Sequence, residues 1–299
     1  MDGLIIKAQS GFFTVSTERG EWICQLRGRL KKGRRKGDVA AIGDYVEFTP
    51  LDDGQGVIES IKPRRSLFTR KAPTPQGEYQ QILLANADQV VLVFACAEPA
   101  PRFTMLDRFL VIAEKQGIPA RIVANKVDLV DYAEAVRMFG HYPALGYEVI
   151  YTSTRQAMGI EEMRASLEGK ISLLTGPSGV GKTSLLNQIK SGLGLLVREV
   201  SRATSKGRHT TVVRELFPLG GNGYVADTPG LKALAFWDIE PEELDGYFPE
   251  LRSLVESCQF SDCSHRREPQ CAVLAAVQAG KIHPARYESY MRMRFGDID

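Results

Sequence analysis

The stretch GPSGVGKTS at residues 176–184 restricts the fold of this chain more than any other feature. It fits the pattern G-x-x-x-x-G-K-[ST], with the apolar run ISLLT before it and the helical stretch SLLNQI after it. In this strand–loop–helix context, glycines allow backbone N–H groups to surround phosphate oxygens, and the helix N-terminus adds positive potential. We therefore predict a phosphate-binding loop formed by Gly176, Pro177, Ser178, Gly179, Val180, Gly181, Lys182, Thr183 and Ser184.

Several side chains of this region have predicted roles in nucleotide chemistry. Lys182 would contact the β- and γ-phosphates and is a candidate catalytic residue, and the Thr183 hydroxyl would ligate Mg²⁺. The later motif DTPG follows the strand-like run GYVA, so Asp227 would hold Mg²⁺ through water and the Gly230 amide would contact the γ-phosphate. The polar segment between them offers two magnesium-binding candidates, and the sequence does not choose between Thr210 and Thr211.

A guanine-recognition motif, Asn125-Lys126-Val127-Asp128, begins at the last residue of the run ARIVAN (120–125). The Asp128 carboxylate would accept hydrogen bonds from guanine N1–H and the exocyclic amine, a pair that adenine lacks. Asn125 would contact the base edge, and the Lys126 stem would cover the ring face. Ser153 ends another strand-like run, where its backbone would meet guanine O6. The motif favours GTP, and an ATPase is the weaker alternative because of Asp128.

The order of these motifs is unusual, because the guanine-recognition motif precedes the phosphate loop. In an ordinary GTPase it follows. In a doubly wound sheet the ligand binds at the carboxyl ends of the strands, so the site survives when the old termini are joined and the chain is cut elsewhere. We therefore predict a circularly permuted α/β GTPase domain.

Apolar runs and breaks along the chain indicate three structured regions. Residues 1–62 contain five short β-like runs separated by turns, which favours a small OB-fold barrel. Apolar strands alternate with helices from residue 88 onward, as in a mostly parallel sheet, whereas residues 240–257 and the segments after them are expected to be helical. The predicted domains are an OB-fold RNA-binding domain (1–65), a linker (66–80), the permuted GTPase domain (81–234) and a zinc-binding helical domain (235–299).

The composition is that of an ordinary soluble protein, with 43% hydrophobic and 25% charged residues. No apolar run approaches the ~18 residues that span a bilayer, and no export signal is visible, so a cytoplasmic location without membrane binding is expected.

Five cysteines is an odd count, and three of them lie within residues 258–271. This crowding favours a metal site in a reducing compartment over disulfides.

The metal ligands are expected to be Cys258, Cys263, His265 and Cys271. Three thiolates and one imidazole complete a tetrahedral shell, which suits one structural Zn²⁺ ion. Cys24 and Cys96 lie in apolar strand-like runs and are expected in the core.

Basic charge is concentrated in one segment, RGRLKKGRRK at residues 27–36. With a net charge of only +2 for the whole chain, the remainder is net negative. An isolated charge run is usually a solvated loop, but beside an OB-like barrel RNA contact is favoured. The predicted RNA-binding residues are Arg27, Arg29, Lys31, Lys32, Arg34, Arg35 and Lys36.

Together these motifs resemble the circularly permuted GTPases that act on the small ribosomal subunit, the RsgA (YjeQ/YloQ) family. The resemblance rests on NKVD (125–128), GPSGVGKTS (176–184), GRHTT (207–211), DTPG (227–230) and the Cys/His cluster. It implies a GTP hydrolase that assists late maturation of the 30S subunit and binds 16S rRNA. It also implies Mg²⁺ bound with GTP. A monomer is expected.

The residue after DTPG is Leu231, where Ras-like enzymes carry the glutamine that positions the attacking water. Slow intrinsic hydrolysis is therefore expected, with stimulation by the subunit. His209 is the local candidate for the missing catalytic group, and the resemblance favours it. The alternative function is a constitutive rRNA-binding protein in which nucleotide is mainly structural.

Overall fold

The computed structural model describes residues 1–31, 37–74, 77–190, 214–227 and 239–296. The chain divides into two compact units. Unit 1 comprises Met1–Val91, Ile160–Ser178 and Lys182–Leu234, and unit 2 comprises Leu92–Gly159, Gly179–Gly181 and Ala235–Asp299. Strand β8 (Gln89–Ala95) begins in unit 1 and ends in unit 2.

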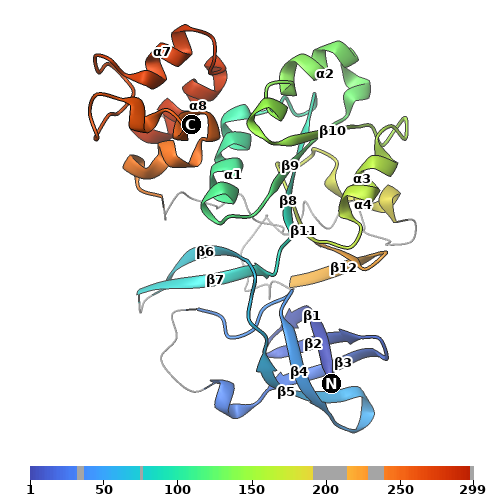
Figure 1. Cartoon of the computed structure of the whole chain (residues 1–299). Coiled ribbons are helices and arrows are strands. Elements are labelled where there is room, and N and C mark those ends of the chain that lie inside the picture. Colours follow the sequence, from blue (N-terminus) through green and yellow to red (C-terminus); the bar gives the residue numbers. More distant parts are fainter. Residues whose placement is uncertain (32–36, 75–76, 191–213, 228–238, 297–299) are drawn as a thin grey trace. The chain divides into compact units, whose positions relative to one another are not determined.

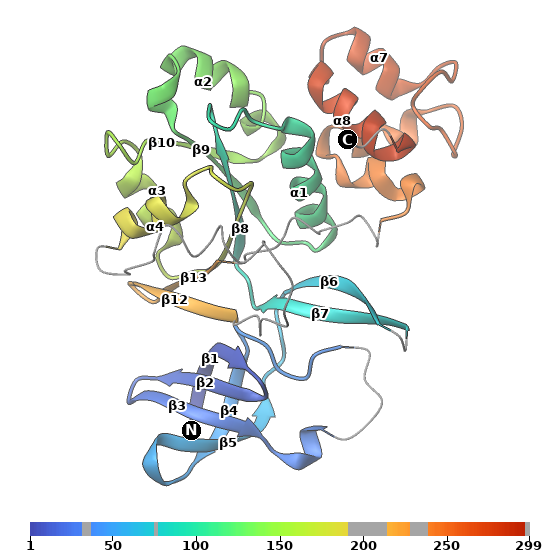
Figure 2. The same ribbon diagram turned by 180° about the vertical axis from the view of Figure 1, so that it is seen from behind.

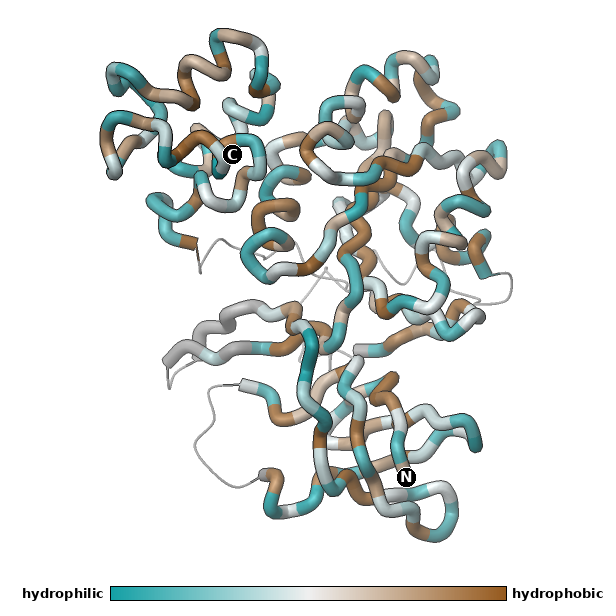
Figure 3. The backbone as a smooth tube through the Cα atoms, in the orientation of Figure 1, coloured by the Kyte–Doolittle hydropathy of each residue, from teal (hydrophilic) through white to brown (hydrophobic). Residues whose placement is uncertain are grey.

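Unit 1 begins with a closed five-stranded barrel (Figure 1). Its strands are β1 (Asp2–Gln9), β2 (Phe12–Thr17), β3 (Gly20–Leu26), β4 (Tyr45–Pro50) and β5 (Gln55–Ile61). They pair in the order β1-β2-β3-β5-β4, and β4 pairs back to β1 to close the barrel. Buried and more exposed positions alternate along β2, β3, β4 and β5, whereas Leu4, Ile5 and Ile6 of β1 are buried in a row. Hydrophobic and hydrophilic residues are interspersed along the barrel strands (Figure 3), and Ile5, Val15 and Ile58 are fully buried. The predicted OB-like barrel is confirmed.

A two-stranded ribbon follows the barrel, formed by β6 (Leu67–Thr74) and β7 (Gly77–Ala85) (Figure 2). The segment 66–80, expected to be a linker, therefore has regular structure. Its prolines suggested an irregular connection, but Pro73 lies opposite Glu78 in a ribbon that has only edge strands, where proline is tolerated. The role of this segment as a connection between domains stays a prediction.

The rest of unit 1 supplies the strands and helices around the phosphate loop. They are α3 (Ile160–Leu167), β11 (Ile171–Thr175), α4 (Lys182–Ile189), β12 (Arg214–Gly220) and β13 (Gly223–Asp227). β11 pairs in parallel with β13, which pairs antiparallel with β12. β12 also continues the barrel sheet, because Glu215 lies opposite Lys7 of β1 and forms an ion pair with it at 3.3 Å.

Unit 2 contains the strands that carry the guanine-recognition motif. Its elements before the C-terminal segment are the end of β8, α1 (Phe103–Lys115), β9 (Ala120–Asn125), α2 (Tyr132–Phe139) and β10 (Glu148–Thr152). β9 lies between β8 and β10 and pairs in parallel with β10. The alternation of strands and helices predicted from residue 88 onward is confirmed in residues 88–190.

The C-terminal segment 239–296, here called the metal module, belongs to unit 2 and is helical in its regular elements. It contains α6 (Pro249–Arg252), α7 (Ala272–Gln278) and α8 (Pro284–Phe295), with short 3₁₀ turns at 241–247 and 255–257. Residues 240–257, expected to be helical, form short helical segments that are interrupted before Pro249. Pro249 cannot donate the hydrogen bond that would extend a preceding helix, so it instead begins α6.

Candidate nucleotide and metal sites

The predicted phosphate loop lies between a buried strand and a helix, as its pattern requires. All five residues of β11 are buried, and α4 begins at Lys182. Gly176, Gly179 and Gly181 have φ angles of +146°, +82° and +94°, which residues other than glycine rarely adopt. These glycines therefore set the path of the loop.

Lys182 closes this loop with its own ammonium group. Lys182 Nζ donates to the carbonyl oxygens of Gly176 at 2.8 Å and Pro177 at 2.7 Å. The positive charge is thus held at the start of the loop, and the side chain of Thr183 in the first turn of α4 is buried.

Asn125 fixes the guanine-recognition motif against the loop residues of the same unit. Its Nδ2 donates to the Val180 carbonyl at 2.8 Å, and its Oδ1 accepts from the Thr152 hydroxyl at 2.9 Å. Thr152 lies directly opposite Asn125 in the β9–β10 pairing. A Cβ atom on Gly181 would lie 2.5 Å from Asn125 Nδ2, so only glycine allows this approach.

The remaining residues of the motif are positioned by short polar contacts. The Ser153 hydroxyl donates to Asp128 Oδ1 at 2.6 Å, and Ser153 also accepts from the Gln156 amide at 3.1 Å. Lys126 adopts a left-handed backbone conformation with φ of 62°, and its ammonium group donates to the Glu98 carbonyl. Val127 is buried. One Asp128 oxygen is thereby oriented by Ser153, while the carboxylate remains an acceptor.

Asp227 is the last residue of β13, where it pairs in parallel with Leu174 of β11. Its backbone therefore lies at the carboxyl end of the strand beside the one that leads into Gly176. This is the edge at which ligands bind in parallel α/β sheets.

Other predicted site residues lie outside the described part of the chain. They are Lys32, Arg34, Arg35, Lys36, His209, Thr210, Thr211 and Gly230.

The described part of the basic segment is paired with an acid that sequence reasoning missed. Arg27 forms an ion pair with Glu59, and Arg29 Nη2 lies 3.4 Å from Glu59 Oε2. Lys31 ends the short 3₁₀ turn that follows Arg27. Glu59 comes from β5, which runs parallel to β3, so its proximity depends on strand pairing over more than thirty positions. Contact of Arg27, Arg29 and Lys31 with RNA stays a prediction.

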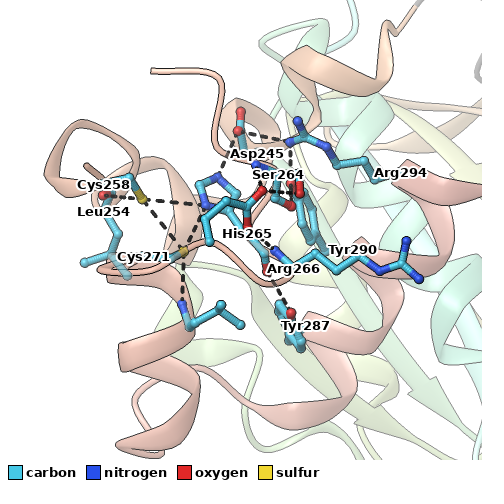
Figure 4. Close-up of polar contacts among 12 residues, drawn as sticks. Asp245, Leu254, Cys258, Ser264, His265, Arg266, Cys271, Tyr287, Tyr290 and Arg294 are labelled. Atoms are coloured by element: carbon cyan, nitrogen blue, oxygen red, sulfur yellow. Dashed lines mark hydrogen bonds and ion pairs between the residues drawn. The ribbon is translucent and has the colours of Figure 1, made fainter. Parts of the chain in front are cut away.

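The four predicted metal ligands lie together in the metal module. The ligand atoms of Cys258, Cys263, His265 and Cys271 all lie within 4.8 Å of one another. Figure 4 shows three of these residues, Cys258, His265 and Cys271. Cys258 Sγ is 3.9 Å from Cys271 Sγ, and His265 Nδ1 is 3.6 Å and 3.4 Å from these two sulfurs. A tetrahedron with metal–sulfur bonds of about 2.3 Å and metal–nitrogen bonds of about 2.0–2.1 Å has edges of roughly 3.5–3.8 Å. The cluster therefore fits a tetrahedral metal site.

Asp245 contacts His265, one of the predicted ligands, and was not identified from the sequence (Figure 4). Its Oδ2 lies 3.1 Å from His265 Nε2, so the carboxylate can accept that N–H and leave Nδ1 toward the cysteines. Burial alone would raise the pKa of Asp245, but the contacts with His265 and Arg294 lower it below the usual range. The partners are twenty positions apart in the sequence, so no local pattern marks them.

Glu268 holds the loop between the ligands. It accepts backbone N–H groups of Ser264, Arg266 and Arg267 at 2.8–2.9 Å, and the Ser264 hydroxyl also donates to it. Burial alone would raise the pKa of Glu268, but these hydrogen bonds lower it well below its usual range. The carboxylate thus remains ionised and fixes the turn that presents His265.

The other two cysteines are core residues, as predicted. Cys24 and Cys96 are buried, and burial raises the pKa of each thiol to about 11. Both thiols therefore stay protonated near neutral pH.

Two solved structures resemble the whole chain. YjeQ from Thermotoga maritima matches with a TM-score of 0.78 and 38% identity, covering 99% of this chain and 97% of that one. YloQ, described as a circularly permuted GTPase, matches with a TM-score of 0.74 and 32% identity, covering 98% and 93%. The fold is therefore that of a circularly permuted GTPase, preceded by an OB-like barrel and followed by a helical metal module.

Sequence comparison identifies the family. Residues 61–237 match the model of the RsgA GTPase, and residues 2–58 match that of the RsgA N-terminal domain. Relatives named small ribosomal subunit biogenesis GTPase RsgA include one from Gemmatimonas aurantiaca, 45% identical over 298 residues, which span 98% of this chain and 96% of the relative. Another from Moorella thermoacetica is 43% identical over 293 residues, which span 97% and 95%. The chain belongs to the RsgA family. Among the described residues, no helix is both long enough and apolar enough to cross a membrane.

Proposed function

We propose that this protein hydrolyses GTP on the small ribosomal subunit and assists late maturation of that subunit. The main observation behind the proposal is the hydrogen bond that Asn125 Nδ2 donates to the Val180 carbonyl of the phosphate loop. This contact joins a motif suited to guanine with a loop suited to phosphates. Relatives that match nearly the whole chain are named small ribosomal subunit biogenesis GTPases, which supports the same partner here.

Guanine recognition rests on Asp128. Its carboxylate would accept from guanine N1–H and the exocyclic amine, with Ser153 holding the carboxylate in place. Asn125 would contact the base edge, and the Lys126 stem would cover the ring while Glu98 fixes its ammonium group. Adenine offers no matching donors, so GTP and GDP are the expected ligands.

Phosphate binding rests on the loop backbone and on Lys182. The N–H groups between Gly176 and Ser184 would surround the phosphates, and Lys182 would exchange its contacts with Gly176 and Pro177 for the β- and γ-phosphates. Thr183, Asp227 and one of Thr210 or Thr211 would hold Mg²⁺, which neutralises charge on the phosphates when bound. Gly230 would contact the γ-phosphate.

Hydrolysis is expected to be slow without a partner. Leu231 cannot orient water, so the positioning group must come from His209 or from the subunit. His209→Ala should abolish most subunit-stimulated turnover and leave GTP affinity unchanged. Unchanged stimulated turnover in this variant would exclude His209.

We also propose that the metal is a structural Zn²⁺ ion. Three sulfurs and one imidazole nitrogen are the ligand set that zinc prefers, and they leave no coordination position open for a substrate. The expected domain roles are RNA binding for 1–65, a connection at 66–80, the GTPase at 81–234 and the zinc domain at 235–299. The basic segment 27–36 would contact 16S rRNA, and a monomeric protein in the cytoplasm is expected.

Co-sedimentation tests the partner independently of catalysis. The protein is centrifuged with purified small subunits in the presence of GDP or a non-hydrolysable GTP analogue. The proposal predicts a larger bound fraction with the analogue, falling steeply as salt rises because phosphate contacts release counterions. Equal binding in both nucleotide states would favour the constitutive rRNA-binding protein.

A further inference from the structure

Helix α1 (Phe103–Lys115) has two buried faces, although a helix at the edge of an α/β domain commonly has one. One face packs on the sheet of unit 2, where Phe109 meets Phe94 of β8 with ring centroids 6.4 Å apart. The other face includes Val111, which belongs to the hydrophobic core of the metal module. Asp107 lies one turn before Val111 on this second face and is 1% exposed.

Arg286 of α8 joins the metal module to this face. It is also 1% exposed, and its Nη1 lies 2.6 Å from Asp107 Oδ1. Its Nε and Nη2 donate to the two Glu250 oxygens at 2.6 Å and 3.2 Å. One guanidinium group thus bridges a carboxylate of α1 and a carboxylate of α6, and these three residues form what we call the Arg286 network.

Aromatic rings exclude water from this network. The Arg286 guanidinium lies 4.5 Å from the Phe248 ring centroid, and Phe248 is fully buried. The Tyr142 hydroxyl donates to Asp107 Oδ1 at 2.9 Å, and Tyr142 is also fully buried. Since Tyr142 lies between α2 and β10, the network also reaches the segment that leads into β10.

Further contacts along α1 continue the same interface. Glu114 accepts from the Tyr147 hydroxyl at 3.1 Å and from Arg252 Nη1 at 3.4 Å. Lys115 Nζ lies 3.8 Å from Glu243 Oε2. Asp107, Val111, Glu114 and Lys115 follow helical spacing, so a single stripe of α1 holds the metal module.

The buried network dominates the energetics of this interface. Exposed ion pairs such as Glu114–Arg252 contribute little. Removing one member of a buried pair leaves an uncompensated charge, which is among the most destabilising changes in a protein. The same helix packs beside the end of β8, where the Cys96 amide donates to the Asn125 carbonyl at 2.8 Å.

We propose that the Arg286 network makes the metal module, α1 and the guanine-recognition strand β9 one cooperative unit. Residues 92–159 and 235–299 belong to the same compact unit, which supports this grouping. A conformational change on nucleotide exchange therefore does not bend the chain between α1 and the metal module. The metal module moves together with Asn125–Asp128.

Hydrogen exchange of the full-length, metal-loaded protein tests this proposal. In the unsubstituted protein, amides of α1, β9 and α8 are expected to show matching protection. Arg286→Met should increase the exchange rate of all three together by ~100-fold or more, because two buried carboxylates lose their partner. Arg292→Met is the matched control, since Arg292 lies on the same helix, is half exposed and forms an ion pair with Glu288, one helical turn earlier, at 2.7 Å. It should leave the three segments unchanged.

If Arg286→Met does not fold, Arg286→Lys provides a second test of the proposal by the same hydrogen-exchange measurement. A single ammonium group keeps the charge but cannot bridge Asp107 and Glu250 in the same geometry, so exchange should rise ~10-fold in all three segments. Acceleration confined to α8 in either variant would overturn the proposal, as would faster exchange of α8 than of α1 in the unsubstituted protein. Those results would make the metal module an independently opening domain.

Discussion

At the scale of single residues, the site depends on buried polar side chains that have specific hydrogen-bond partners. Asn125 donates to Val180 and accepts from Thr152, and both Asn125 and Thr152 are fully buried. Thr152→Val keeps the shape of the side chain but leaves Asn125 Oδ1 without its partner. The free energy of unfolding should fall by about 1–3 kcal/mol, with a matching loss of GTP affinity. Thr14→Val, on the barrel strand β2, should change neither quantity in denaturant titrations and nucleotide-binding assays.

Base selection should be decided by Asp128. Asp128→Asn places an amide donor where guanine presents its amine, so GTP affinity should fall by ~100-fold or more. Xanthosine triphosphate, which has an oxygen in place of that amine, should bind better than GTP. Asp131→Asn is the control, because Asp131 is exposed at the start of α2. Unchanged GTP preference in Asp128→Asn, measured by competition with a fluorescent nucleotide, would contradict the proposed base contact.

The close approach of Gly181 to Asn125 gives a steric test. Gly181→Ala places a Cβ atom 2.5 Å from Asn125 Nδ2 at a φ of +94°. Gly117→Ala has a positive φ of +62° but no neighbour within 4 Å. Both variants should lose roughly 1–2 kcal/mol of stability from backbone strain. Only Gly181→Ala should also lose GTP affinity, by ~10-fold or more. Equal nucleotide affinity in the two variants would exclude a role for the contact.

At the scale of elements, metal binding by the metal module should depend on Asp245 as well as on the four predicted ligands. Asp245→Ala removes the acceptor for His265 Nε2 and should weaken metal binding by about 10–100-fold. Asp262→Ala removes an exposed carboxylate of the same module and is the control. Competition with a colorimetric chelator measures both metal affinities, and equal values would exclude a role for Asp245 in metal binding.

Complete removal of the metal by a chelator should unfold α7 and α8, which circular dichroism would detect as a loss of helical signal.

Elements were predictable from the sequence where local pattern decides them. The strands β8, β9 and β11 consist mostly of buried residues. Helices follow these strands along the chain, as predicted: α1 lies between β8 and β9, and α2 and α3 lie between β9 and β11. Residues 240–257 were predicted to be helical, and the structure divides them into short helical segments, one of which begins at Pro249. The ribbon β6–β7 was missed because prolines in edge strands look like those of loops.

Long-range partners could not be predicted from one sequence. Glu59, Asp245 and Arg286 meet their partners across 32, 20 and 179 positions. Each contact depends on how elements pack, which a local motif does not encode. The phosphate loop, the guanine-recognition motif and the Cys₃His cluster could be predicted because the residues of each follow one another at a fixed spacing in the sequence.

At the scale of the whole molecule, the permuted chain places a barrel before a GTPase and a metal module after it. The barrel strand β1 pairs with β12, the first described strand after residues 191–213, whereas the metal module packs on α1. Each flanking module thus has a direct contact with a different element of the GTPase. This arrangement suits a protein whose hydrolysis responds to a large partner.

Multiple-turnover GTP hydrolysis, with and without purified small ribosomal subunits, tests the central claim most directly. ATP serves as the control nucleotide, and large ribosomal subunits serve as the control partner. Slow GTP turnover alone, at least ~10-fold stimulation by small subunits and no turnover of ATP are the expected results. GTP turnover that small subunits leave unchanged would contradict the proposed subunit-dependent GTPase.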